Sequence, residues 1–102
     1  MKKHRFNIII NDAVADEIQE AVDYYKEKQK SLGNRFYTTV KRTLKSLQKD
    51  ALLYQVKYKS VHCIKVKKFP YLIHYKVNQT SNTVHVYALI CTHKNPDENW
   101  VE

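Results

Sequence analysis

The sequence contains few of the residues that break, bend or crosslink a chain. It has one glycine, two prolines and two cysteines in 102 residues. Cys63 and Cys91 are too few for a disulfide-rich scaffold and lack the His/Cys spacing of a zinc site, so neither a metal nor a cofactor is expected. No apolar run approaches the roughly 20 residues of a membrane span, and no signal peptide is evident. A cytoplasmic protein that contacts no membrane is therefore predicted.

Acidic residues are missing from residues 51–96, which contain seven lysines and four histidines. The formal net charge of the whole chain is +8, and most of the excess lies in this stretch. Such a surface attracts phosphate groups or an acidic peptide. A lysine-rich face that is merely solvated is the plainer alternative.

The first half of the chain predicts one strand followed by two helices. Residues 5–10 are rich in β-branched side chains, which favours a strand, and Asn11 then offers an N-cap. Apolar residues recur at helical spacing over residues 13–29 and 31–49, so two amphipathic helices are expected, the second with Ser31 as a possible cap. Their short connection predicts an antiparallel hairpin.

The second half predicts three strands with two unlike faces, over residues 60–68, 69–77 and 83–94. Aliphatic residues are expected to face the helices, including Ala88 and Ile90 near the end of the last strand. The opposite face is expected to present Lys65, Lys67, His74, Lys76, His85 and Tyr87. The predicted fold is α+β in the order βααβββ, with a small twisted antiparallel sheet packed against the hairpin. We expect a single domain over residues 1–102.

Several local motifs follow one another along nearly the whole chain. They are Tyr24-Tyr25, Leu32-Gly33-Asn34-Arg35-Phe36, Phe69-Pro70-Tyr71-Leu72-Ile73-His74-Tyr75 and a C-terminal His93-Lys94-Asn95-Pro96 with Trp100. Together with the element order, they resemble the RelE/ParE superfamily of bacterial type II toxins. The resemblance implies the RelE/ParE-like fold and a cognate antitoxin protein that holds the toxin inactive.

Two activities occur on that fold. RelE-like members cut messenger RNA in the ribosomal A site, without metal, by attack of the 2′-OH on the adjacent phosphate. Such cleavage needs cations for the phosphorane, an acid–base pair and an aromatic plane for a base. ParE-like members instead inhibit DNA gyrase and need no nuclease residues. Whether this chain is an enzyme therefore depends on which branch it follows.

The strand positions match a RelE-like nuclease only in part. Lys65 matches one of two expected lysines, but Cys63 stands at the position of the other. Leu72 takes the place of an outward arginine. These losses, and the long helical hairpin, favour the ParE-like branch.

At the C-terminal positions, this chain has residues related to those expected in a RelE-like nuclease. Lys94 stands where an arginine is expected, and this exchange loses bidentate contact with phosphate. His93 beside it can serve as acid or base, and Trp100 matches the C-terminal aromatic residue. If the protein is RelE-like, the catalytic candidates are Lys65, His93 and Lys94.

The histidines keep the RelE-like alternative open despite these losses, because histidines can form a nuclease site in place of the expected cations. His62 is expected to point inward or lie at an edge, without a catalytic role. The candidates for target binding are Lys67, His74, His85, Tyr87 and Trp100.

We therefore predict the toxin of a type II toxin–antitoxin module, with gyrase inhibition preferred over ribosome-dependent mRNA cleavage. One alternative is a non-toxic relic that only binds an antitoxin. Another is an unrelated RNA-binding module.

Overall fold

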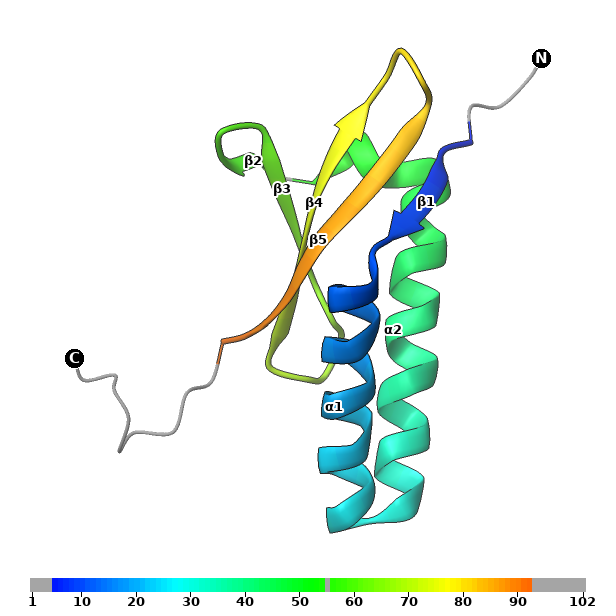
Figure 1. Ribbon diagram of the computed structural model, residues 1–102, viewed down its shortest axis with the longest axis vertical. Helices are drawn as coiled ribbons and strands as arrows, with labels where there is room; N and C mark the ends of the chain where they lie inside the picture. Colours follow the sequence, from blue (N-terminus) through cyan, green and yellow to red (C-terminus); the bar gives the residue numbers. More distant parts are fainter. Residues whose placement is uncertain (1–4, 55, 93–102) are drawn as a thin grey trace.

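The structure, a computed structural model, describes residues 5–54 and 56–92. Its elements are β1 (Asn7–Ile10), α1 (Asp12–Lys28), α2 (Lys30–Asp50), the short 3-10 helix η1 (Ala51–Leu53), β2 (Val56–Tyr58), β3 (Val61–Lys65), β4 (Tyr71–Asn78) and β5 (Thr83–Cys91). One five-stranded sheet, in the order β1-β5-β4-β3-β2, packs against the helical hairpin (Figure 1). The predicted α+β class and element order are confirmed. The three-residue edge strand β2 is an addition, too short for its periodicity to stand out.

The sheet is mixed. β1 runs parallel to β5, with Asn7 opposite Thr83 and Ile10 opposite Val86, whereas the other neighbours are antiparallel. The two antiparallel helices bring the chain back to the end of the sheet where β1 begins, and the Phe6 N–H donates to the carbonyl of Gln48, near the end of α2, at 2.8 Å. The strands β3, β4 and β5 then alternate in direction, so β5 runs the same way as β1 (Figure 1).

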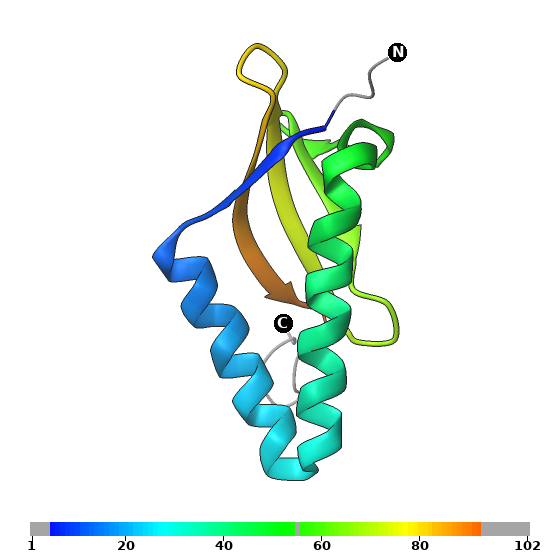
Figure 2. The ribbon, with the colours of Figure 1, turned by 90° about the vertical axis from the view of Figure 1, so that its right-hand side faces the viewer.

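The helix ends show one correct and one wrong prediction. The Asn11 side chain caps α1 by accepting a hydrogen bond from the Val14 N–H at 2.9 Å. The second helix begins at Lys30, directly after the single extended residue Gln29, and has no side-chain cap. Ser31 therefore lies inside α2, and its predicted capping role is wrong. One linking residue is enough because its extended backbone turns the chain sharply at the tip of the hairpin (Figure 2).

The only glycine of the chain sets how closely the two helices approach. Gly33 is buried against α1, and a Cβ atom there would meet the Cγ of Lys26 and lie 3.0 Å from the backbone oxygen of Val22. A backbone atom cannot withdraw as a side chain can. The missing side chain therefore permits the contact between α1 and α2.

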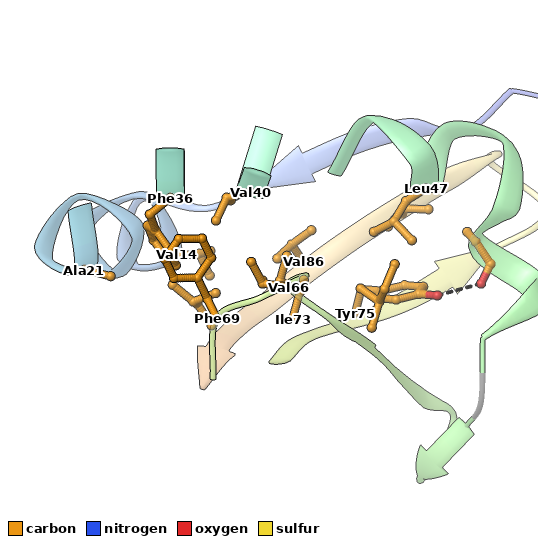
Figure 3. Close-up of a cluster of buried hydrophobic side chains, with 14 of the residues drawn as sticks. Val14, Ala21, Phe36, Val40, Leu47, Val66, Phe69, Ile73, Tyr75 and Val86 are labelled. Carbon is orange, nitrogen blue, oxygen red and sulfur yellow. Dashed lines mark hydrogen bonds between the residues drawn. The ribbon is translucent and has the colours of Figure 1, made fainter. Parts of the chain in front are cut away.

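The core lies between the hairpin and the sheet (Figure 3). Phe36 and Leu47 of α2 are fully buried against β4, where Ile73 and Tyr75 point toward the helices. The Tyr75 hydroxyl satisfies its hydrogen-bonding need by donating to the Ala51 carbonyl at 2.8 Å. This bond ties the end of α2 to the middle of the sheet.

Candidate functional site

A β-bulge interrupts the predicted alternation along β5. Tyr75 pairs with Val86, but the preceding residue of β4, His74, pairs with Ala88. Tyr87 is therefore an extra residue in β5. Because successive side chains in a strand point to opposite faces, one extra residue reverses the facing of every residue that follows.

Beyond the bulge the residues of β5 exchange faces. Leu89 is buried toward the hairpin, and its backbone N–H donates to the Glu17 carboxylate of α1 at 3.0 Å. Ile90, by contrast, is 42% exposed, and both it and Ala88 line a hollow with His74 on the outer face, the side of the sheet away from the helices. The prediction that Ala88 and Ile90 face the helices is therefore wrong. Alternation read from the sequence has no means of locating the inserted residue.

The reversal adds Ala88 and Ile90 of β5 to an outer face that already contains Cys63 of β3 and Leu72 of β4, and these four residues form an apolar patch. The cross-strand register places Leu72 between Lys65 on one side and Ile90 on the other. An open hollow of about 430 Å³ adjoins Ala88 and Ile90. The outer face is therefore not the uninterrupted basic surface that its lysines suggest.

The predicted residues His85 and Tyr87 lie at one end of the outer face, together with Lys76; we call these three the basic cluster. Lys76 is opposite His85 in register, and its Nζ lies 5.6 Å from the centre of the Tyr87 ring. The rings of His85 and Tyr87 are 6.4 Å apart. His74, which is half-buried, lies within the apolar patch, paired with Cys63 on one side and with Ala88 on the other.

The predicted residues Lys65 and Lys67 lie at the opposite end. The Lys65 ammonium donates to the Phe69 carbonyl at 3.1 Å, and Lys67 is exposed in the turn between β3 and β4. Lys65 pairs with Leu72, four residues along β4 from Lys76, which corresponds to about 13 Å at 3.3 Å per residue. The structure thus separates the predicted cations into two groups with the apolar patch between them.

A larger hollow, of about 850 Å³, opens beside Lys65; we call it the turn hollow. Tyr24 and Tyr25 of α1 line it from one side, and Tyr71 and Cys91 line it from the sheet. Burial raises the pKa of Tyr71 to about 12, and the nearby Cys91 thiol adds to the shift. The hydroxyl therefore stays protonated at neutral pH and can donate a hydrogen bond.

Sequence reasoning missed the turn hollow. The tyrosines of α1 and β4 were visible as separate motifs, but nothing local indicates that they converge. Their meeting depends on how α1 docks on the sheet. Two lysines, Lys65 and Lys68, complete the rim, so the hollow combines aromatic surface with positive charge.

Several predicted features are structural or lie elsewhere. His62 points inward as predicted: its Nδ1 lies 2.7 Å from the Tyr54 carbonyl, and its ring stacks on Tyr75. His93, Lys94 and Trp100 lie outside the described residues. In residues 5–54 and 56–92 no group of three or more His, Cys, Asp or Glu side chains could hold a metal ion. No helix in this part of the chain has the length and apolar character needed to cross a membrane.

Comparison with known proteins shows a likeness to solved structures. No protein-family model and no curated protein matches the chain. A chain of a solved structure, described as "Chromosomal ParDE TA system from P. aeruginosa", superposes with a TM-score of 0.78. The match covers 89% of this chain and 100% of that chain, at 12% sequence identity. The expected RelE/ParE-like fold is thereby confirmed.

Proposed function

We propose that this protein is the growth-inhibiting toxin of a type II toxin–antitoxin module, active in the cytoplasm and neutralised by a cognate antitoxin. The observation that carries the proposal is the fold: one chain of a chromosomal ParDE system matches it over 89% of its length. Three of the four motifs that resemble the superfamily lie on α1, on α2, and on β4 with the turn before it, and their aromatic rings meet between hairpin and sheet. Sequence and architecture therefore support the same assignment.

The outer face supports a protein partner. Protein interfaces have an apolar centre and a polar rim, and the apolar patch has this arrangement, with Lys65 at one end and the basic cluster at the other. An antitoxin segment with aliphatic side chains and flanking acids complements both parts. Its acids would also offset the +8 charge of the chain.

For the target we propose ParE-like inhibition of DNA gyrase. Cleavage by a RelE-like mechanism requires several cations that converge on one phosphate. Two positions at which RelE-like nucleases carry such cations are Cys63 and Leu72, and both belong to the apolar patch. Among the nuclease positions in residues 5–54 and 56–92, Lys65 is the one retained cation, and it already donates to the Phe69 carbonyl. This arrangement favours binding to a protein over RNA cleavage.

The first experiment is induction of the chain in bacteria without an antitoxin, with incorporation of labelled methionine and labelled thymidine followed in parallel. A stop in thymidine incorporation, with translation intact and with purified protein inhibiting gyrase supercoiling, is the expected result. An early stop in translation with messenger RNA cut at ribosome-positioned sites would instead identify a nuclease. No effect on either would identify a relic that only binds antitoxin.

Substitutions separate the two mechanisms further. Under the proposed mechanism Lys65→Ala and His93→Ala both retain growth arrest, as does the matched control Lys68→Ala. Loss of arrest in Lys65→Ala and His93→Ala, with Lys68→Ala still active and circular dichroism unchanged, would contradict gyrase inhibition. It would instead place these residues, with Lys94, in a nuclease site.

A further inference from the structure

The two helices of the hairpin carry opposite charge. α1 contains six acidic and two basic residues, whereas α2 contains six basic residues and one acidic residue, Asp50, at its end. No Asp or Glu occurs between Lys28 and Lys49. The hairpin is therefore strongly polarised across its width, although its net charge is small.

The basic residues of α2 form one continuous stripe on its solvent side. The six members are all exposed: Lys30, Arg35, Lys41, Arg42, Lys45 and Lys49. At 3.6 residues per turn they cover an arc of about 140°, opposite the buried side chains of Phe36, Val40 and Leu47. From Lys30 to Lys49 the stripe is about 28 Å long at 1.5 Å per residue. Figure 2 shows α2 along the front of the molecule, with the sheet behind it.

We propose that this α2 stripe binds the phosphate backbone of duplex DNA, independently of base sequence. Its composition suits a polyanion better than a protein. Tyr37 is the one large apolar side chain of α2 that is well exposed, so the stripe lacks the apolar centre of a protein interface. A row of cations about 28 Å long matches the dense, regular charge of a duplex, and release of counterions drives such binding.

The arrangement of the cations favours DNA over duplex RNA. The major groove of B-DNA is about 12 Å wide and admits an α-helix, whereas that of A-form RNA is deep and narrow. Lys30 and Lys41 lie on one margin of the stripe, and Arg35 and Arg42 lie on the other. A helix laid against the groove can therefore reach phosphates on both rims. The acidic face of α1 repels phosphate and limits the duplex to the α2 side.

The test is fluorescence anisotropy of the full-length protein with a labelled 25-base-pair duplex of arbitrary sequence, titrated at several salt concentrations. The triple variant Lys41→Gln, Lys45→Gln and Lys49→Gln removes three cations from the stripe and keeps good helix formers. Its matched control, Lys65→Gln, Lys67→Gln and Lys76→Gln, removes three cations from the sheet and turn. Both variants have the same net charge.

The stripe variant is expected to bind DNA at least tenfold more weakly than the control variant. The slope of log affinity against log salt should fall by about 0.9 for each phosphate that is no longer neutralised, or roughly 2.7 for three. An RNA duplex of the same sequence should bind more weakly than the DNA. Circular dichroism of both variants should match that of the parent.

Three results would overturn the proposal. Equal losses in the two variants would mean that only net charge matters, and tighter binding of the RNA duplex would exclude DNA as the preferred partner. Sedimentation that shows self-association at low salt, abolished by the stripe substitutions and unaffected by DNA, would show that the stripe instead contacts the acidic α1 face of a second copy. Growth arrest is measured in a separate experiment, so failure of the DNA-binding proposal would leave the toxin proposal unaffected.

Discussion

The two faces of the sheet use the same strands in different ways. Toward the hairpin, Ile73 and Tyr75 of β4 are buried against α2, and Leu89 of β5, which follows the bulge, is buried on the same face. On the outer face, Leu72 and Ile90 are covered by no element of the described chain. Both faces contain aliphatic residues, so aliphatic character alone does not mark a core. The difference is that one face is covered within the chain, and the other presents its apolar residues to a partner.

Truncation of two neighbouring residues of β4, one on each face of the sheet, tests this difference most directly. Ile73 is 1% exposed, and Ile73→Ala should lower the free energy of unfolding by about 3 kcal/mol through lost burial and a cavity. Leu72→Ala, on the outer face, should cost less than about 1 kcal/mol, because its side chain is not enclosed. Urea unfolding of both variants measures the difference. Equal losses would mean that the outer face is also enclosed.

The contact between the helices comes next in expected size. Gly33→Ala places a methyl group against the backbone of α1, so the helices must separate despite the better helix propensity of alanine. A net loss of roughly 1.5 kcal/mol is expected, at the low end of the cost of overpacking. Asn34→Ala, one residue along on the exposed side, serves as control and should be neutral or slightly stabilising. Thermal unfolding that ranks the two variants the other way would contradict the close approach seen at Gly33.

The buried hydrogen bond of the inner face should have a smaller effect. Tyr75→Phe keeps the ring but removes the donor to the Ala51 carbonyl, which should cost about 1 kcal/mol. Tyr87→Phe, at the exposed bulge, removes a hydroxyl on the outer face and should leave stability unchanged within about 0.5 kcal/mol. Chemical unfolding of the pair tests the contrast. A larger loss in Tyr87→Phe would show that the bulge is structurally coupled to the core.

The smallest effect at neutral pH is that of tyrosine ionisation, because it appears only above about pH 10. Burial raises the pKa of Tyr71 from 10.0 to about 12 and also raises that of Tyr75. Because the folded state holds these protons more tightly than the unfolded state, stability is complete below pH 10 and should decline as pH rises from about 10 toward 12. Tyr71→Phe should flatten that decline in melting curves recorded across this range. An unchanged slope would show that Tyr71 does not contribute to it.

Much of the fold was predictable because its signals are local. The helical spacing of apolar residues indicated α1 and α2 to within one residue at each end, and Asn11 indicated the start of α1. Strict alternation indicated β4, in which Ile73 and Tyr75 face the core as expected. The superfamily motifs then indicated the RelE/ParE-like fold, which the structural match confirmed.

The candidate site was less predictable because it depends on pairing between strands. The predicted cations Lys65 and Lys76 were expected on one basic surface, and they do lie on one face. Leu72 separates them through the pairing of β3 with β4, whereas Ile90 joins Leu72 only because of the bulge at Tyr87, which exists only relative to β4. The turn hollow likewise requires Tyr25 and Tyr71 to meet across the interface between helix and sheet.

The sequence by itself determined the two helices and their hairpin, the longer strands, the acid-free basic stretch of residues 51–96 and the opposite charges of the two helices. Each of these is a property of neighbouring residues along one segment, where spacing and charge act over a few ångströms. Only the tertiary structure decided which side of β5 becomes core, because a single extra residue in one strand reverses every later side chain without changing the composition. The same extra residue brings Ala88 and Ile90 to the outer face, where they join Cys63 and Leu72 in the apolar patch between two groups of cations.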